Sequence, residues 1–180
     1  SLFAVPTTVY GIVFSGAVSP STIVPINIDG DSDLDVAVSG SASDRVYIGV
    51  NDGAGNFSGY TPEYYQVGDD PHAMLTGDFN NDTYPDLALV NTGSGTNGNT
   101  LAVLLHNGAS GGFAATTYVP VGTAPRGLGM GDFDKDGDLD LVVANYGSTT
   151  SVPPIPSTLK IMINNGGVFT DSGVDYATDS

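Results

Sequence analysis

Short apolar runs alternate with polar turns along this chain, and the same order of runs and turns occurs three times. In each copy an apolar run precedes an acidic loop, and two further apolar runs follow it. An Asn- and Gly-rich turn then leads to a phenylalanine that opens a fourth stretch. Because Asn-Gly and Asp-Gly between β-type runs are strong hairpin signals, each copy is predicted to form a four-stranded antiparallel meander.

The expected strands occupy equivalent positions in the three copies. They cover residues 23–26, 34–38, 46–50 and a stretch from Phe57; 73–76, 87–90, 101–105 and a stretch from Phe113; and 127–130, 139–144, 159–163 and a stretch from Phe169. Four strands in roughly fifty residues is the size of one β-propeller blade. We therefore expect an all-β fold, with three four-stranded antiparallel blades of a β-propeller-like array. The array is incomplete in one chain, because closed propellers have about four to eight blades.

The 180 residues are expected to form a single repeat domain (1–180). Blade 1 is placed at 20–70, blade 2 at 71–124 and blade 3 at 125–180, after an outer strand and lead-in at 1–19. Residues 3–10 resemble an outer strand without a blade of its own. Either the chain is a piece of a longer protein, or copies assemble and this strand completes the sheet edge of a neighbour by β-augmentation.

An acidic loop joins the first two strands of each copy, beginning at residues 27, 78 and 132, and each loop lies seven residues after a proline, at Pro20, Pro71 and Pro125. Alternating Asp with a Gly that lets the backbone fold back is how proteins wrap calcium, a hard cation that takes about six to eight oxygens. The sequence therefore predicts up to three calcium ions.

The ligands are expected to be side-chain oxygens from the first, third, fifth and ninth loop positions and a backbone carbonyl from the seventh. The side-chain candidates are Asn27, Asp29, Asp31 and Asp35; Asp78, Asn80, Asp82 and Asp86; and Asp132, Asp134, Asp136 and Asp140, and the carbonyl candidates are Asp33, Tyr84 and Asp138. Asn at a ligand position lowers the negative charge, so the first two sites are expected to bind more weakly than the third. The ions are expected to be structural, since binding free energy then becomes folding free energy.

The charge and composition of the chain limit the classes of partner and of reaction that it suits. Four Lys and Arg against 20 Asp and Glu give a net charge of −16, which argues against nucleic acid and anionic membranes. The chain has no Cys, no apolar run long enough to span a membrane, and one glutamate, Glu63. Acid–base machinery is poorly supplied, so the protein is predicted not to be an enzyme. The abundance of Ser, Thr, Asn and Gly is typical of a secreted or cell-surface β protein.

Strand parity places the acidic loops at one end of the blades and the longest connections, 39–44, 91–99 and 145–157, at the other. Ser21, His72 and Arg126 follow the repeat's proline at equivalent positions near that second end. Hydrogen bonds between blades are the favoured role for His72 and Arg126, and pockets for a carbohydrate are the alternative. His106 ends a strand and is expected to be a satisfied edge residue.

The segments Gly77-Asp78-Phe79-Asn80 and Gly131-Asp132-Phe133-Asp134-Lys135-Asp136-Gly137 resemble the FG-GAP or VCBS repeat of integrin alpha-subunit propellers and many bacterial extracellular proteins. The resemblance covers nearly the whole chain and is weaker in the first copy, where Asn27-Ile28 replaces the family's Asp-Phe. It implies calcium-stabilised blades that serve adhesion, carbohydrate or protein binding.

The leading hypothesis is a non-enzymatic extracellular calcium-binding structural or adhesion repeat protein. It is expected to self-associate through its open blade edges into a ring or filament. The alternatives are a lectin-like carbohydrate-binding propeller and a propeller fragment of a larger secreted adhesin or polysaccharide-acting enzyme. The expected partners are a second copy or the remaining blades of a longer chain, with a glycan or a surface protein as further options.

Overall fold

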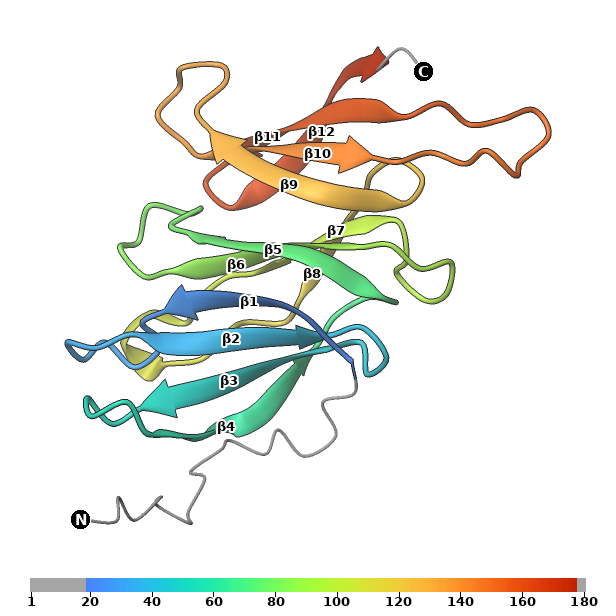
Figure 1. Cartoon of the computed structure of the whole chain (residues 1–180). Helices are drawn as coiled ribbons and strands as arrows, with labels where there is room; N and C mark the ends of the chain where they lie inside the picture. The colour runs from blue at the N-terminus through green and yellow to red at the C-terminus, as the bar shows by residue number, and fades with distance from the viewer. Residues whose placement is uncertain (1–18, 178–180) are drawn as a thin grey trace, which may run out of the picture.

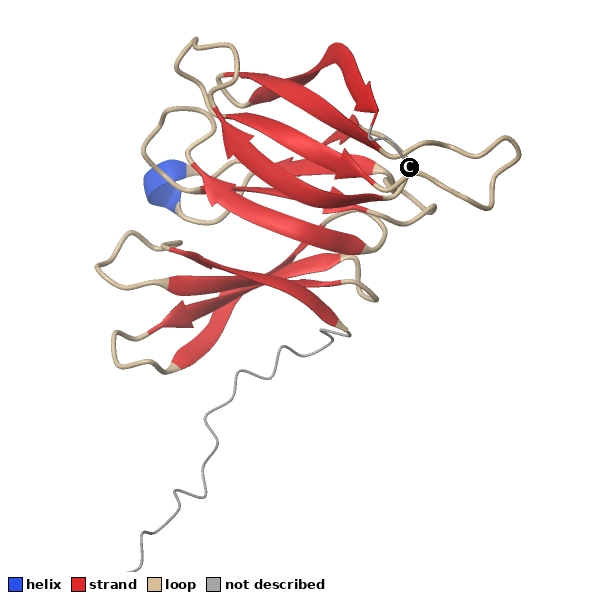
Figure 2. Cartoon of the chain, turned by 45° about the horizontal axis from the view of Figure 1, so that its top comes forward, coloured by secondary structure: helices blue, strands red, loops and turns tan. Residues whose placement is uncertain are grey.

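The structure is a computed structural model that describes residues 19–177. It consists of three four-stranded antiparallel sheets and one short 3-10 turn, η1 (Gly108–Ser110) (Figures 1 and 2). The prediction of an all-β fold with three four-stranded blades is confirmed. The outer strand expected at 3–10 lies outside the described residues. In the part of the chain that is described, no helix has the length and apolar character needed to cross a membrane.

Within each sheet the strands follow one another in chain order, so every blade is a meander. Blade 1 contains β1 (Pro20–Ile26), β2 (Asp35–Gly40), β3 (Arg45–Asn51) and β4 (Phe57–Gln66). Blade 2 contains β5 (Pro71–Gly77), β6 (Asp86–Asn91), β7 (Thr100–Leu104) and β8 (Thr117–Pro120). Blade 3 contains β9 (Pro125–Gly131), β10 (Asp140–Asn145), β11 (Thr158–Asn165) and β12 (Val168–Ala177).

The fourth strand of blade 2 begins later than the sequence predicted. It was expected to open at Phe113, but β8 starts at Thr117, and Phe113 forms only an isolated bridge with His106. The phenyl ring is buried and meets the Tyr65 ring edge-on at a centroid distance of 5.1 Å. Phe113 therefore fills the space between blades 1 and 2 and does not extend a strand.

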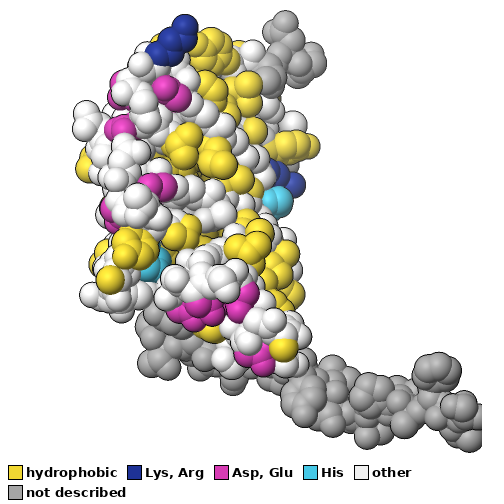
Figure 3. All heavy atoms as spheres, turned by 90° about the vertical axis from the view of Figure 1, so that its left-hand side faces the viewer, with side chains coloured by type: hydrophobic (Ala, Val, Ile, Leu, Met, Phe, Trp, Pro, Cys, Tyr) yellow, Lys and Arg dark blue, Asp and Glu magenta, His cyan; other side chains and the backbone are white. Residues whose placement is uncertain are grey.

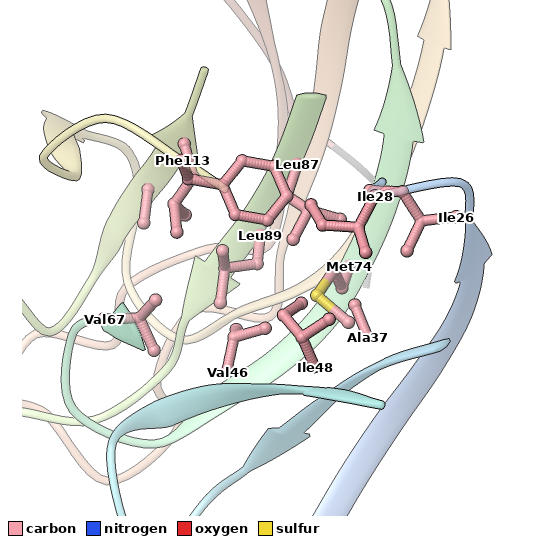
Figure 4. Close-up of a cluster of buried hydrophobic side chains, with 12 residues drawn as sticks. Ile26, Ile28, Ala37, Val46, Ile48, Val67, Met74, Leu87, Leu89 and Phe113 are labelled. Carbon is pink, nitrogen blue, oxygen red and sulfur yellow. The ribbon is translucent and has the colours of Figure 1, made fainter. Parts of the chain in front are cut away.

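Blade 2 is packed between the other two blades, with one apolar core on each side. Leu87 and Leu89 of β6 lie in the core shared with blade 1, and Ala88 and Val90 lie in the core shared with blade 3. Successive side chains of a strand point to opposite faces, so a strand buried on both sides reads as a continuous apolar run. Figure 4 shows the first core, in which side chains from both blades meet.

The ends of the blades are arranged as strand parity predicts. The acidic loops and the β3–β4 and β11–β12 turns lie on the left in Figure 1, and the long connection between β10 and β11 projects to the right. Figure 3 looks onto the loop end, where Asp and Glu side chains gather. Acidic side chains therefore gather at one end of the blades, and the long β10–β11 connection lies at the other (Figures 1 and 3).

Candidate functional site

The three acidic loops share one pattern of internal hydrogen bonds. In the third loop, the carboxylate of Asp134 accepts from the backbone N–H of Asp136 at 3.2 Å, and that of Asp136 accepts from the N–H of Asp138 at 2.9 Å. The third and fifth positions of the other loops make the same bonds to the N–H groups of Asp31, Asp33, Asp82 and Tyr84. Side chains at these positions are thereby turned toward the inside of the loop.

The turn that gives this shape needs a left-handed backbone at the fourth position of every loop. Gly30 has φ 78°, Asn81 has φ 59° and Lys135 has φ 67°. Glycine and asparagine adopt this region readily, whereas a lysine in it is destabilised by roughly 1 kcal/mol or more, because its Cβ is close to the backbone. The third loop keeps this conformation at a lysine, and Asp132 accepts the N–H of Lys135 at 2.6 Å.

The third loop brings three carboxylates together. Oxygens of Asp132, Asp134 and Asp136 all lie within 4.8 Å of one another, and these side chains are exposed. Two oxygens that bind one Ca²⁺ at about 2.3–2.6 Å are at most about 5 Å apart. The donor set contains only oxygen, which a hard cation prefers, so the residues fit calcium.

The electrostatics of the third loop agree with that fit. Loss of hydration raises the pKa of Asp134. The N–H of Asp136 acts in the opposite direction, and the carboxylates of Asp136 and Asp140 raise the pKa further. The pKa of Asp33 in the first loop is raised in the same way, by loss of hydration and then by Asp31. Crowded carboxylates oppose their own ionisation, and a cation among them relieves this repulsion.

The first two loops carry an amide where the third has an acid. Asn27 takes the first position of loop 1, where its amide nitrogen donates to the carbonyl of Asp31 at 2.7 Å. Asn80 takes the third position of loop 2 and donates to the carboxylate of Asp82 at 3.0 Å. Among the described residues, no group of three acids converges in these loops as it does in the third. Their calcium-ligand residues stay predictions.

Seventh-position side chains are engaged away from the loop interior. Asp138 accepts from the Asn81 amide at 2.6 Å and from the N–H of Gly166 at 2.8 Å. The Tyr84 ring stacks on His106 with an interplanar angle of 1°. Asp33 differs, because its Oδ1 is buried without a hydrogen-bond partner. The carbonyl-ligand role of the seventh positions stays a prediction.

The ninth-position acids have a structural role that the sequence did not reveal. Asp86 is fully buried and accepts two backbone hydrogen bonds, from the N–H of Phe79 at 2.8 Å and from that of His106 at 2.7 Å. Asp35 and Asp140 are also fully buried and make the equivalent two bonds. Asp35 accepts from the N–H groups of Ile28 and Asn51. Asp140 accepts from the N–H groups of Phe133 and Asn164. Each acid therefore ties its loop to the end of the third strand.

These bonds leave room for a second role. A carboxylate offers about four lone-pair directions, so two amide donors do not exhaust it, and the ligand role of the ninth position stays a prediction. Burial raises the pKa of Asp86, and the N–H groups of His106 and Phe79 act in the opposite direction. The acid is held in the interior by those two donors.

Comparison with known families matches the FG-GAP-like repeat to residues 27–89 and 84–143. The chain belongs to this family. The two matched segments span all three acidic loops. No match was found among curated proteins. The chain is similar to a solved structure of a protein assigned as a 6-phosphogluconolactonase from Bacteroides fragilis, with 14% identity and a TM-score of 0.40. That similarity covers 89% of this chain and 56% of the other, so this chain spans about half of that protein's length.

Successive FG-GAP-like blades are linked beside the acidic loops. The ring of His106 in blade 2 bonds through Nε2 to the carbonyl of Ile28 in blade 1 at 3.0 Å. In blade 3, the Asn164 amide donates to the carbonyl of Phe79 in blade 2 at 2.7 Å. Both acceptors hold the second loop position. The donors hold equivalent positions, Asn164 near the end of β11 and His106 just past the end of β7. The expectation that His106 is a satisfied edge residue is met at Nε2 only, since Nδ1 is buried without a hydrogen-bond partner.

A second set of links joins the same blades at the opposite end. The Ser21 hydroxyl donates to the carbonyl of Pro71, and the Thr92 hydroxyl donates to the carbonyl of Pro125, each at 2.6 Å. In both cases the acceptor is the repeat's proline in the next blade. Ser21 fulfils the junction role that the sequence assigned to His72 and Arg126.

Arg126 makes a different contact. Its guanidinium lies over the ring of Tyr146 at 5.0 Å, and both side chains are exposed. A hollow of about 190 Å³ opens beside them and is lined by Leu159. Ser21, His72 and Arg126 all occupy a register shift between the first two strands of their blades, so their equivalence is confirmed.

Proposed function

We propose that this chain is a non-enzymatic array of calcium-stabilised propeller blades with a structural or adhesive role outside the cell or at its surface. The observation that carries the proposal is the convergence of Asp132, Asp134 and Asp136 within 4.8 Å. Three ions, one per loop, would change the formal charge of the chain from −16 to −10. Calcium would then relieve the repulsion that the fold imposes on its own loops.

The hydrogen bonds around the loops support a structural role for the ion. Phe79 follows the first ligand position of loop 2, and its carbonyl accepts from Asn164 of the next blade. A loop fixed by calcium would present this carbonyl in a single geometry. Ion binding would therefore stabilise the junction between blades as well as the turn itself.

The non-enzymatic part of the proposal rests on the supply of acid–base groups. The chain contains one glutamate, Glu63, and two histidines, of which His106 is stacked on Tyr84 and bonded to the Ile28 carbonyl. Many of the Asp residues lie in the acidic loops and are better explained as ligands or anchors. We further propose that copies of the chain associate with one another.

A second candidate function, carbohydrate binding, is supported by Arg126 and Tyr146. The hollow beside them adjoins another of about 270 Å³ that is lined by Tyr146, Pro154 and Ile155. An exposed aromatic ring and a guanidinium suit the ring face and the acidic group of an acidic sugar. Screening the chain on a glycan array tests this function, and a binder that Arg126→Ala does not weaken would exclude this site.

Calcium titration tests the leading proposal. Isothermal titration calorimetry of chelator-treated protein should show calcium binding, and the midpoint of thermal unfolding should rise with added calcium. An ion at about 100 times its Kd adds about 2.7 kcal/mol of stability. Asp134→Asn should weaken binding at the third site, and the exposed loop variant Val152→Ser serves as the matched control. A chain whose unfolding is the same in calcium and in chelator would contradict the proposal.

A further inference from the structure

The second and third acidic loops, which join β5 to β6 and β9 to β10 on the left of Figure 1, are in direct contact with each other. The side-chain amide of Asn81 in the second loop donates to the carboxylate of Asp138 in the third loop at 2.6 Å. Because the acceptor is charged, a bond of this kind is roughly twice as strong as one between neutral groups. We call this hydrogen bond the loop bridge.

Asp138 connects the loop bridge to the candidate ion site of the third loop. Its backbone carbonyl, at the seventh position, is a predicted calcium ligand, and its N–H is held by the carboxylate of Asp136 at 2.9 Å. The second oxygen of its side chain accepts the N–H of Gly166 at 2.8 Å. An ion that fixes the backbone of Asp138 therefore also fixes the carboxylate that holds Asn81.

Asn81 lies at the fourth position of the second loop, between the candidate ligands Asn80 and Asp82. Its backbone is left-handed, with φ 59°. The side-chain oxygen of Asn80 accepts the N–H of Asp82 at 3.1 Å. Asp134 and Asp136 repeat this bond in the third loop. The two loops thus arrange these oxygens alike, and the loop bridge restrains the turn on which the oxygens of the second loop depend.

The turn between β11 and β12 adds a further contact between the two loops. Gly166 donates to Asp138 of the third loop. Gly167 is buried against the second loop, where a Cβ on this glycine would lie 3.2 Å from the Cβ of Asn80. This turn therefore holds the two loops in one arrangement.

Within the described residues, the first and second loops are joined differently. Gly30, at the fourth position of the first loop, has no side chain to form a bridge. The seventh position of the second loop is Tyr84, whose ring stacks on His106. A hollow of about 420 Å³ is lined by these three residues. The bond from His106 to the Ile28 carbonyl resembles that from Asn164 to Phe79, so the loop bridge is what distinguishes the two junctions.

We propose that the loop bridge couples ion binding in the second and third loops, so that calcium in either loop raises the affinity of the other. Calcium in the third loop fixes Asp138, which holds Asn81, so the second ion meets a turn that is already ordered. Coupling between two binding sites is reciprocal and commonly amounts to about 5–150-fold in affinity. The first loop binds independently. This inference rests on the proposed function, because it needs an ion in both loops.

Calcium titration of the isotope-labelled, chelator-treated chain, followed by nuclear magnetic resonance, measures each loop separately. The backbone N–H groups of Asp31, Asp82 and Gly137 report on the first, second and third loops, because each is bonded to a candidate ligand side chain of its own loop. Asp134→Asn combined with Asp136→Asn empties the third loop. This pair removes two negative charges, as a bound Ca²⁺ does, so the net charge of the empty variant loop equals that of the ion-loaded loop.

Emptying the third loop should raise the calcium concentration that half-saturates the second loop by about fivefold or more. The value for the first loop should change by less than about twofold, since no loop bridge reaches it. The first loop therefore serves as a control within the same sample.

Asn81→Gly removes the loop bridge and keeps the turn, because glycine adopts φ 59° readily and holds the same position in the first loop. In this variant, emptying the third loop should change the affinity of the second by less than about twofold. Asn97→Gly is the matched control, since Asn97 is an exposed asparagine with φ 55° at the other end of the same blade. It should retain the full coupling. Circular dichroism checks that each variant is folded.

The outcomes separate this inference from the proposed function. A weakening of the second loop that Asn81→Gly abolishes and Asn97→Gly does not supports the coupling. Equal affinity of the second loop with the third loop full or empty overturns it. Coupling that persists in Asn81→Gly overturns the role of the loop bridge and assigns the coupling to Asn164 and Phe79. A chain in which only the third loop binds calcium overturns the coupling and leaves the proposed function, whereas a chain in which no loop binds overturns both.

Discussion

The side-chain amide of Asn164 donates a hydrogen bond to the backbone carbonyl of Phe79, 2.7 Å away in the preceding blade. The same amide nitrogen donates to the Leu139 carbonyl at 3.1 Å, and its oxygen accepts from the N–H of Gly167 at 2.9 Å. Asn164 is fully buried. One side chain therefore satisfies groups of an acidic loop, of its own hairpin and of the neighbouring blade.

Replacing Asn164 by Ala should destabilise the protein by about 1–3 kcal/mol, because the buried carbonyl of Phe79 and the partly buried carbonyl of Leu139 lose their donor. Urea unfolding monitored by circular dichroism measures the change. The neighbouring residue Asn165 is exposed, and Asn165→Ala should change the free energy of unfolding by less than about 0.5 kcal/mol. Equal losses in the two variants would mean that the junction bond contributes nothing.

Asp140 and Asp134 should respond differently to the same isosteric change. In chelator, Asp140→Asn should lower the free energy of unfolding by about 1–3 kcal/mol, because an amide nitrogen would face one of the N–H groups of Phe133 and Asn164. Asp134→Asn should be nearly neutral in chelator and should weaken calcium binding. Calorimetry and urea unfolding, each with and without calcium, separate the two effects. A neutral Asp140→Asn would contradict the anchoring role.

The second loop offers a test of the charge argument. Asn80→Asp should raise the calcium affinity of this loop, because it restores an acid at the third position. In chelator the same variant should be less stable, since the hydrogen bond from Asn80 to Asp82 is replaced by repulsion between carboxylates. The midpoint of thermal unfolding should therefore differ more between calcium and chelator in this variant than in the unchanged chain. A smaller difference would argue against calcium in this loop.

Lys160 provides a stabilising contribution that depends on pH. Its ammonium lies 2.5 Å from Asp171 and 3.0 Å from Asp175. The bond to Asp171 raises the pKa of Lys160, and the same bond lowers the pKa of Asp171. The contribution is thus present between the ordinary pKa values of about 3.8 and 10.5, and is lost as pH falls through the lowered value or rises through the raised one.

Lys160→Met keeps the apolar stem and removes both ion pairs. Because Asp171 and Asp175 are largely exposed, the variant should lose no more than about 1 kcal/mol near pH 7. The difference from the unchanged chain should vanish as pH falls through the lowered pKa of Asp171, which urea unfolding between pH 2 and 8 would show. A difference that persists in acid would have to come from packing.

The sequence by itself determined the features that depend on neighbouring residues. The order of apolar runs and Asn-Gly turns was sufficient for three four-stranded meanders, because hairpin turns and alternation act over a few residues. The spacing of Asp in the third loop likewise predicted that Asp132, Asp134 and Asp136 lie together. Within residues 19–177, the outer strand of blade 2 was misplaced, because Phe113 is held by packing against Tyr65 of another blade.

Tertiary structure alone decided how the blades hold one another. The bonds from His106 to Ile28 and from Asn164 to Phe79 join residues 78 and 85 positions apart, and no local pattern records such pairs. The burial that gives Asp86 its anchoring role also comes from packing. The difference between Leu101, which is fully buried against blade 3, and its equivalent Leu159 in blade 3, which is 37% exposed, has the same origin.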